Sequence, residues 1–176
     1  MNILILHGIG GHAGVHWQEW LKKELEKKNH TVYMPDLPES NHPKRFDWLH
    51  EVKEIAKSIP HSKLIIIGHS LGVVTALDFI EQSDKKIHGL VSVSGFSEDY
   101  GAELNSYFMK EKDIQFSEVN KHVSKVHVLI GDNDPYVPQE TLTSLADLLG
   151  VHPEIIKDGG HLNIDSGFST FPQLLV

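Results

Sequence analysis

The chain has 176 residues, of which 40% are hydrophobic and 23% are charged, and its formal net charge at pH 7 is −8. This length and composition are typical of one globular domain with one core, while the negative charge and the lack of a Lys/Arg-rich stripe argue against a nucleic-acid partner. No cysteine is present, which excludes disulfides, thiolate metal sites and cysteine nucleophiles.

The chain opens on the short apolar run 3–6, directly before a Gly-rich turn. The run is too short for a signal h-region or a membrane span, and no basic n-region precedes it. We therefore interpret it as the first strand, and we expect a cytoplasmic protein with no membrane span.

Apolar runs then alternate with helix-like segments along the chain. The runs 3–6 and 64–67 are apolar at every position, as expected of strands covered on both faces. Strands are expected at 2–7, 31–34, 63–67, 88–94, 125–130 and 152–156, and helices at 16–28, 46–58, 71–83, 102–111 and 139–149. This order predicts an α/β fold: a single domain over 1–176 with a mostly parallel six-stranded sheet and helices on both faces.

The segment 95–124 is more polar and less regular than its surroundings. Open α/β sheets bind ligands outside the carboxyl ends of their strands. We expect this segment to form a small insertion over that edge, and we expect residues from 9–16, 36–46 and 96–116 to line a pocket there.

The pentapeptide 68–72, Gly-His-Ser-Leu-Gly, has the form G-x-S-x-G. It lies between the apolar run 64–67 and the start of an expected helix. A strand–turn–helix of this kind holds its serine in a strained conformation with the hydroxyl at the head of the helix. The motif alone is common by chance, but this context makes Ser70 the candidate nucleophile.

A serine nucleophile needs a base and an acid, which the chain supplies in the later loops. Asp134 follows the apolar run 126–130, and His161 follows two glycines after the last expected strand. The order Ser, Asp, His is that of α/β hydrolases. Because loops that follow parallel strands emerge at one edge of the sheet, the three side chains can converge there.

The acid has a competitor in Asp132, and more weakly in Asp158. Either Asp132 or Asp134 could instead be a turn-forming residue beside Pro135. We prefer Asp134 because the pattern Asp-x-x-Val-Pro places it at the loop tip before a helix. His161 is one of 13 histidines, so its position supports the assignment more than its identity does.

The remaining site residues are expected around the first turn and the pentapeptide. The backbone N–H groups of Leu71 and Ile9 are the candidate oxyanion donors. We expect His7, Gly8 and His69 to contact the substrate. His7, His12 and His16 have a spacing that could suggest a metal site, but no H-E-x-x-H pair or cysteine supports one. We expect instead that His7 supports the oxyanion turn and that His12 and His16 lie on the surface or line the cleft, with no metal and no cofactor.

A rival interpretation is a dinucleotide-binding domain. Gly8, Gly10 and Ala13 fit G-x-G-x-x-A after a first strand, and Asp36 lies where a ribose-binding acid is expected. However, Gly14 delays the helix, so its N-terminus lies too late to hold a pyrophosphate. A third alternative is a hydrolase-shaped binding protein with little turnover, because fold alone does not establish activity.

Taken together, the motifs resemble those of the small serine hydrolases of the retinoblastoma-binding-protein-9-like family, with its bacterial YdeN-type members. The resemblance covers nearly the whole chain and rests on His7-Gly8, His16-Trp17, Trp20-Leu21, Met34-Pro35, Asp47-Trp48, residues 68–72, Val93-Ser94-Gly95-Phe96, Asp134-Pro135, Gly159-Gly160-His161 and Gly167-Phe168. It implies a compact α/β-hydrolase fold without a large lid, a triad of Ser70, Asp134 and His161, and no cofactor.

One departure from this family concerns the C-terminus. The family usually continues into a closing helix, whereas only four residues follow Pro172 here. We expect that helix to be short or missing, and apolar surface exposed by its absence would favour self-association.

We therefore expect a carboxylesterase-like serine hydrolase that cleaves a small acyl ester through an acyl-enzyme. The sequence leaves open whether the scissile bond is an ester, an amide, a thioester or a small peptide.

Overall fold

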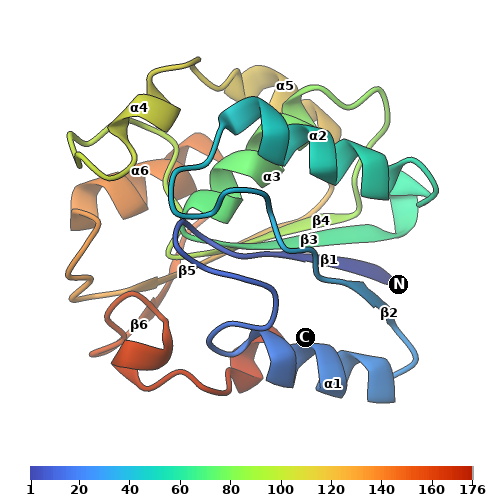
Figure 1. The fold of residues 1–176 in the computed structure, drawn as a ribbon, viewed down its shortest axis with the longest axis horizontal. Helices are drawn as coiled ribbons and strands as arrows, with labels where there is room; N and C mark the ends of the chain where they lie inside the picture. Colours follow the sequence, from blue (N-terminus) through green and yellow to red (C-terminus); the bar gives the residue numbers. More distant parts are fainter. Residues whose placement is uncertain (176) are drawn as a thin grey trace.

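Six parallel strands form one open sheet through the centre of the molecule, in the order β2-β1-β3-β4-β5-β6 (Figure 1). This computed structural model describes residues 1–175. The strands are β1 (Asn2–Leu6), β2 (Thr31–Tyr33), β3 (Leu64–His69), β4 (Gly89–Val93), β5 (Val126–Gly131) and β6 (Glu154–Ile156). The predicted α/β fold with a six-stranded parallel sheet is confirmed.

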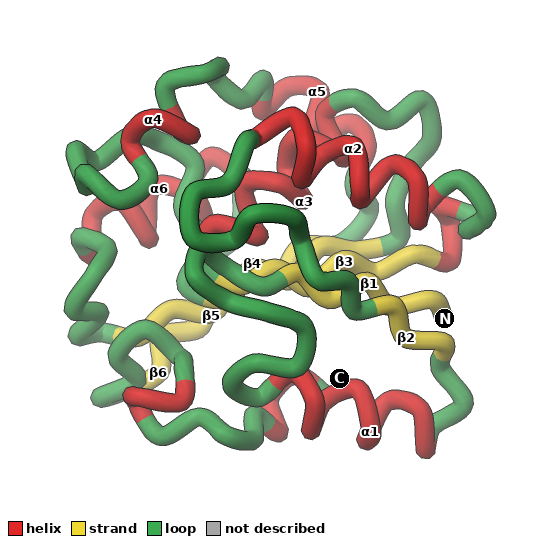
Figure 2. The backbone as a smooth tube through the Cα atoms, viewed as in Figure 1, coloured by secondary structure: helices red, strands yellow, loops and turns green. Residues whose placement is uncertain are grey.

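Helices cover both faces of the sheet, but unequally (Figure 2). On one face lie α2 (Arg45–Ala56), α3 (Leu71–Glu81), α5 (Phe116–His122) and α6 (Gln139–Leu148), and on the other lies α1 (Gln18–Lys27) with the C-terminal segment. The short α4 (Ser106–Met109) and the 3₁₀ turns η1 (His61–Lys63), η2 (Ile164–Ser166) and η3 (Pro172–Leu174) complete the elements.

Strand β1 is buried on both of its faces. Leu4 and Leu6 pack into the core beneath α2 and α3, whereas Ile3 and Ile5 pack toward α1. Each of the four side chains is at most 3% exposed. Successive side chains of a strand point to opposite faces, so a strand covered on both sides needs apolar residues throughout.

The segment 95–124 differs from the sequence prediction. The expected helix at 102–111 shortens to α4, and the unpredicted helix α5 forms over Phe116–His122. Within α5 only Val119 is buried, so the helix has no apolar periodicity from which to predict it. Because α5 packs with α3 in the core, it belongs to the β4–β5 crossover, and only the part around α4 lies over the carboxyl edge.

A buried arginine fastens this part of the chain to the helices. Arg45 is 3% exposed and binds the Asp78 carboxylate of α3 through two hydrogen bonds, of 2.7 and 2.9 Å. Its Nη1 also donates to the backbone carbonyls of Phe108, Met109 and Lys112. The chain that follows α4 is therefore held by a paired and satisfied buried charge.

The sheet face beside α1 is less completely covered. The last element within the described residues is η3, and Leu174 of this turn borders an apolar groove of about 370 Å³ together with Leu25, Ile65 and Val91. The predicted self-association through such a surface stays a prediction. Within residues 1–175, no helix has both the length and the apolar composition that crossing a bilayer requires.

Candidate active site

Ser70 lies in the sharp turn between β3 and α3. Its backbone has φ 54° and ψ −124°, in the left-handed range that L-residues rarely adopt. A Cβ added at Gly68 would lie 2.8 Å from Val73 Cα, and one at Gly72 would lie 2.5 Å from the His7 carbonyl oxygen. The two glycines therefore allow the turn to pack against α3 and β1, and the strained elbow predicted from the sequence is present.

Asp134 and His161 meet beside this turn. His161 Nδ1 lies 2.7 Å from Asp134 Oδ2, and the side chains are 8% and 0% exposed, respectively. The other carboxylate oxygen of Asp134 accepts the N–H groups of Tyr136 at 2.9 Å and Val137 at 3.1 Å. A carboxylate held in this way fixes the proton of the imidazole on Nδ1 and leaves Nε2 free to act as a base.

The competing carboxylate makes a different contact. Asp132 Oδ1 accepts the N–H of Asp158 at 2.7 Å, and Asn133 Oδ1 accepts the N–H of Gly160 at 2.7 Å. These bonds join the loop after β5 to the loop after β6. Asp132 therefore braces the two loops, whereas Asp134 reaches the imidazole.

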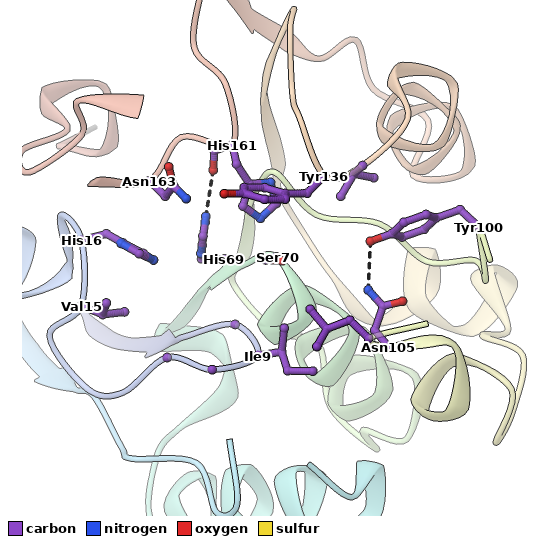
Figure 3. Close-up of a pocket in the computed structure, with 15 residues that line it drawn as sticks. Ile9, Val15, His16, His69, Ser70, Tyr100, Asn105, Tyr136, His161 and Asn163 are labelled. Carbon is purple, nitrogen blue, oxygen red and sulfur yellow. Dashed lines mark hydrogen bonds between the residues drawn. The ribbon is translucent and has the colours of Figure 1, made fainter. Parts of the chain in front are cut away.

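Ser70 and His161 both line a pocket of about 250 Å³ at the carboxyl edge of the sheet (Figure 3). Within residues 1–175, no hydrogen bond joins Ser70 Oγ to His161, and such bonds often tighten only when substrate is bound. The pocket is also lined by Gly8, Ile9, Gly10, Gly11, Val15, His16, His69, Tyr100, Leu104, Asn105, Tyr136, Val137 and Asn163.

The sequence anticipated part of this lining. The ranges 9–16 and 96–116 contribute as expected, but no residue of 36–46 lines the pocket. Tyr136, Val137 and Asn163 were missed, although each lies within three residues of Asp134 or His161. Their closeness in the sequence to the predicted acid and base could have identified them as pocket residues.

Two backbone N–H groups near the nucleophile, from different elements, are without an acceptor within residues 1–175. Neither the Leu71 nor the Ile9 N–H donates a hydrogen bond to any part of the chain that the structure describes. Gly8 passes so close to the serine that a Cβ there would lie 2.9 Å from Ser70 Cβ. The turn after β1 thus lies directly against the elbow.

Tyr100 places a hydroxyl group across the pocket from His16 (Figure 3). Tyr100 Oη accepts a hydrogen bond of 2.9 Å from Asn105 Nδ2. Burial raises the pKa of Tyr100, so the phenol keeps its proton. The segment around α4 therefore contributes both polar and apolar side chains to the pocket wall.

The serine hydrolase family model matches residues 3–176 of this chain. The chain belongs to the serine hydrolase family. The YdeN protein of Bacillus subtilis (strain 168) is 28% identical over 176 residues, covering 97% of this chain and 90% of that protein. Serine hydrolase RBBP9 of Rattus norvegicus is 25% identical over 157 residues, covering 86% of this chain and 81% of that protein.

Solved structures agree on the fold of this serine hydrolase. The crystal structure of the ydeN gene product from B. subtilis has a TM-score of 0.89 at 24% identity, covering 98% of this chain and 94% of that one. A monoacylglycerol lipase from Paleococcus ferrophilus has a TM-score of 0.66 at 17% identity, covering 89% and 83%. The hydrolase therefore has the α/β-hydrolase fold, as the resemblance implied.

His7 supports the turn after β1 in this hydrolase and does not line the pocket. The N–H of Leu37 donates to His7 Nε2 at 2.9 Å, so the ring proton lies on Nδ1, which donates to the Gly8 carbonyl at 2.8 Å. The side chain is 1% exposed, and its burial lowers the pKa. A neutral imidazole thus links the turn to the loop after β2.

The dinucleotide interpretation does not fit this serine hydrolase. Asp36 accepts the N–H of Ala13 at 2.6 Å and so closes the first loop. Helix α1 begins only at Gln18, so it does not follow the glycines directly as the helix of a dinucleotide-binding turn does. The sheet order also differs from the 3-2-1-4-5-6 order of dinucleotide-binding domains.

Proposed function

We propose that this serine hydrolase cleaves carboxyl esters through an acyl-enzyme, with Ser70 as nucleophile, His161 as base and Asp134 as the residue that orients the base. The observation that carries the proposal is the buried 2.7 Å contact between Asp134 and His161 at the pocket that Ser70 lines. Ser70 lies in a strained turn, and His161, which Asp134 orients, lines the same pocket, so the three residue types have the complementary roles that the proposal needs.

The reaction follows from these roles. His161 Nε2 takes the hydroxyl proton of Ser70 while Oγ attacks the ester carbonyl carbon. The tetrahedral intermediate collapses with loss of the alcohol, which receives that proton from His161. A water then attacks the acyl-enzyme, with its proton passing to His161. Collapse of the second intermediate releases the acid, and His161 returns the proton to Ser70 Oγ. Asp134 stabilises the imidazolium that forms in each half.

The oxyanion of each intermediate needs donors that are already in place. The N–H groups of Leu71 and Ile9 are our candidates, because both are without an acceptor within residues 1–175 and flank the serine. Such donors stabilise charge that develops only in the transition state, and loss of one typically costs about 10²–10³ in turnover.

The pocket supports a small acyl substrate. Its volume of about 250 Å³ lies just below the range typical of pockets that bind drug-sized ligands. Ile9, Leu104 and Val137 give it apolar walls. The choice of an ester is supported by structural neighbours that are named a monoacylglycerol lipase and a polyneuridine aldehyde esterase. The proposed mechanism routes no step through a cofactor.

Hydrolysis of p-nitrophenyl acetate and butyrate tests the proposal, with the Ser70→Ala and His161→Ala variants beside the wild type. Both variants should lose nearly all turnover. When residues act as a unit, the loss of one costs about as much as the loss of all of them. Ser92→Ala is the matched control, since Ser92 is also buried but lies outside the pocket lining, and it should keep wild-type turnover.

A fluorophosphonate probe separates the enzyme from a binding protein with the same fold. Intact-mass analysis should show one adduct on the wild type and none on Ser70→Ala, because only an activated serine reacts quickly. Unchanged ester turnover in Ser70→Ala, or a wild type that neither labels nor hydrolyses any ester in the panel, would contradict the proposal.

A further inference from the structure

His69, the residue directly before the nucleophile, is buried among aromatic rings at the back of the pocket. It is 3% exposed. Its ring packs edge-on against those of His161 at 5.0 Å, His16 at 5.2 Å and Trp17 at 6.1 Å between centroids. The sequence suggested that His69 contacts the substrate, but this degree of burial leaves little of the ring for a ligand to touch.

The hydrogen bond of His69 defines its protonation state. His69 Nε2 lies 3.0 Å from the backbone carbonyl oxygen of His161 (Figure 3). A carbonyl only accepts, so Nε2 must carry a proton. Burial holds the pKa of His69 well below its usual range, and a charge on the His161 ring acts in the same direction, whereas the hydrogen bond to the His161 carbonyl opposes them. The side chain is therefore a neutral, single-tautomer donor.

The acceptor lies in a loop whose backbone is unusual. Asp158, Gly160 and Leu162 all have positive φ, of 54°, 54° and 49°. Such conformations persist only where the surroundings determine them. The neighbouring carbonyl, that of Leu162, accepts the indole N–H of Trp17 at 2.9 Å. Hydrogen bonds from Trp17, directly before α1, and from His69, at the end of β3, thus hold this loop in place.

Both His69 and Trp17 bind this loop, but only His69 is also next to the nucleophile in the chain. Its backbone adjoins Ser70 at the end of β3, and its side chain ends on the backbone of His161. One side chain therefore spans from the nucleophile's strand to the base's loop, which are 92 positions apart in the sequence. The Asp134 carboxylate holds the ring of His161, whereas His69 holds its main chain.

We propose that His69 is a positioning residue that sets the separation between Ser70 Oγ and His161 Nε2 through its hydrogen bond to the His161 carbonyl. The inference rests on the proposed function of Ser70 and His161 and assigns His69 a role other than substrate contact. Misplacement of a reacting group by about 1 Å can cost about 10²-fold in rate. Loss of the bond should therefore lower kcat and leave KM nearly unchanged.

A pair of amide substitutions tests the role of the Nε2 donor. In His69→Gln the amide nitrogen can reach the place of Nε2, whereas in His69→Asn it reaches only the place of Nδ1. The two variants are equally polar. With p-nitrophenyl butyrate we expect His69→Gln to keep kcat within about fivefold of wild type, and His69→Asn to lose about 10- to 100-fold, with KM within about threefold in both.

Two further variants separate positioning from loss of stability. Val52→Ala removes fully buried volume beneath α2, away from the His161 loop, and should lower the melting temperature without lowering kcat. His69→Phe keeps a ring but no donor and should behave like His69→Asn. If His69→Phe does not fold, the amide pair alone decides the question.

Equal kcat in the Gln and Asn variants, or wild-type kcat in a folded His69→Phe, would overturn the proposal. A rise in KM with kcat unchanged would instead indicate that His69 contacts the substrate, and it would also overturn the proposal. These outcomes differ from failure of the proposed function, in which Ser70→Ala would itself keep its turnover.

Discussion

The carboxylate of Asp134 lies 2.7 Å from Nδ1 of His161, with both side chains removed from solvent. Asp132, two positions earlier, points instead to the backbone of Asp158. This difference in partner predicts a difference in function between two chemically identical side chains that share one loop.

We expect Asp134→Asn to lower kcat for p-nitrophenyl butyrate by about 10³- to 10⁴-fold, because an amide cannot stabilise the imidazolium and favours the wrong tautomer. Asp132→Asn should cost less than about tenfold, since it weakens only a brace between two loops. Steady-state kinetics on both variants gives the ranking, and the reverse order would remove Asp134 from the proposed triad.

Replacement of Gly8 should impair the nucleophile more than the fold. A Cβ at this position would lie 2.9 Å from Ser70 Cβ and 3.5 Å from Oγ, within the space that the attacking hydroxyl and the substrate need. We expect Gly8→Ala to lower kcat/KM by at least about tenfold, as measured with p-nitrophenyl acetate.

Gly101→Ala is the control for this substitution. Gly101 has φ 81° and nothing within 4 Å of an added Cβ, so the variant should lose about 1 kcal/mol of stability from backbone strain and keep its turnover. Equal kinetic losses in Gly8→Ala and Gly101→Ala would argue against crowding at Ser70.

The buried ion pair between Arg45 and Asp78 predicts a large stability effect. Arg45→Met leaves the Asp78 carboxylate, 1% exposed, with Lys112 as its one charged partner within residues 1–175. Loss of one member of a buried pair typically costs about 3–5 kcal/mol, which urea unfolding can measure. Adding Asp78→Asn should recover part of the loss, and a cost below about 1 kcal/mol in Arg45→Met would contradict this account.

Buried neutral histidines predict that stability falls in mild acid. Burial lowers the pKa of both His7 and His69, whereas in the unfolded chain both should titrate near about 6.5. Below that pH the unfolded state binds protons that the folded state does not, so the free energy of unfolding is fully present above about pH 6.5 and decreases as the pH falls.

Urea unfolding at pH 7.5, 6.5 and 5.5 measures this dependence. Each histidine contributes a slope of up to about 1.4 kcal/mol per pH unit, and His69→Gln should have a shallower slope than the wild type. Equal stability at pH 7.5 and 5.5 would show that these side chains are protonated within the folded protein.

The sequence predicted the sheet well because its strands leave a local signal. Strands buried on both faces must be apolar throughout, and those of β1 and β3 are nearly so. The turn around Ser70 could also be predicted from the sequence. Its glycines are required because a side chain there would collide with residues nearby in the chain or at the end of the neighbouring strand. Helix α5 left no such signal, since only Val119 in it is buried.

The sequence by itself therefore determined the strand–turn–helix at Ser70, the parallel order of the elements and the candidates for base and acid. Only the tertiary structure decided which aspartate meets His161, that the Nε2 atom of His7 binds the backbone of Leu37, and that His69 reaches the carbonyl of the base. Local patterns record which face of an element is buried. They do not record which side chain of a loop meets a partner 27 or 92 positions away, because that depends on how the loops after separate strands converge at one edge of the sheet.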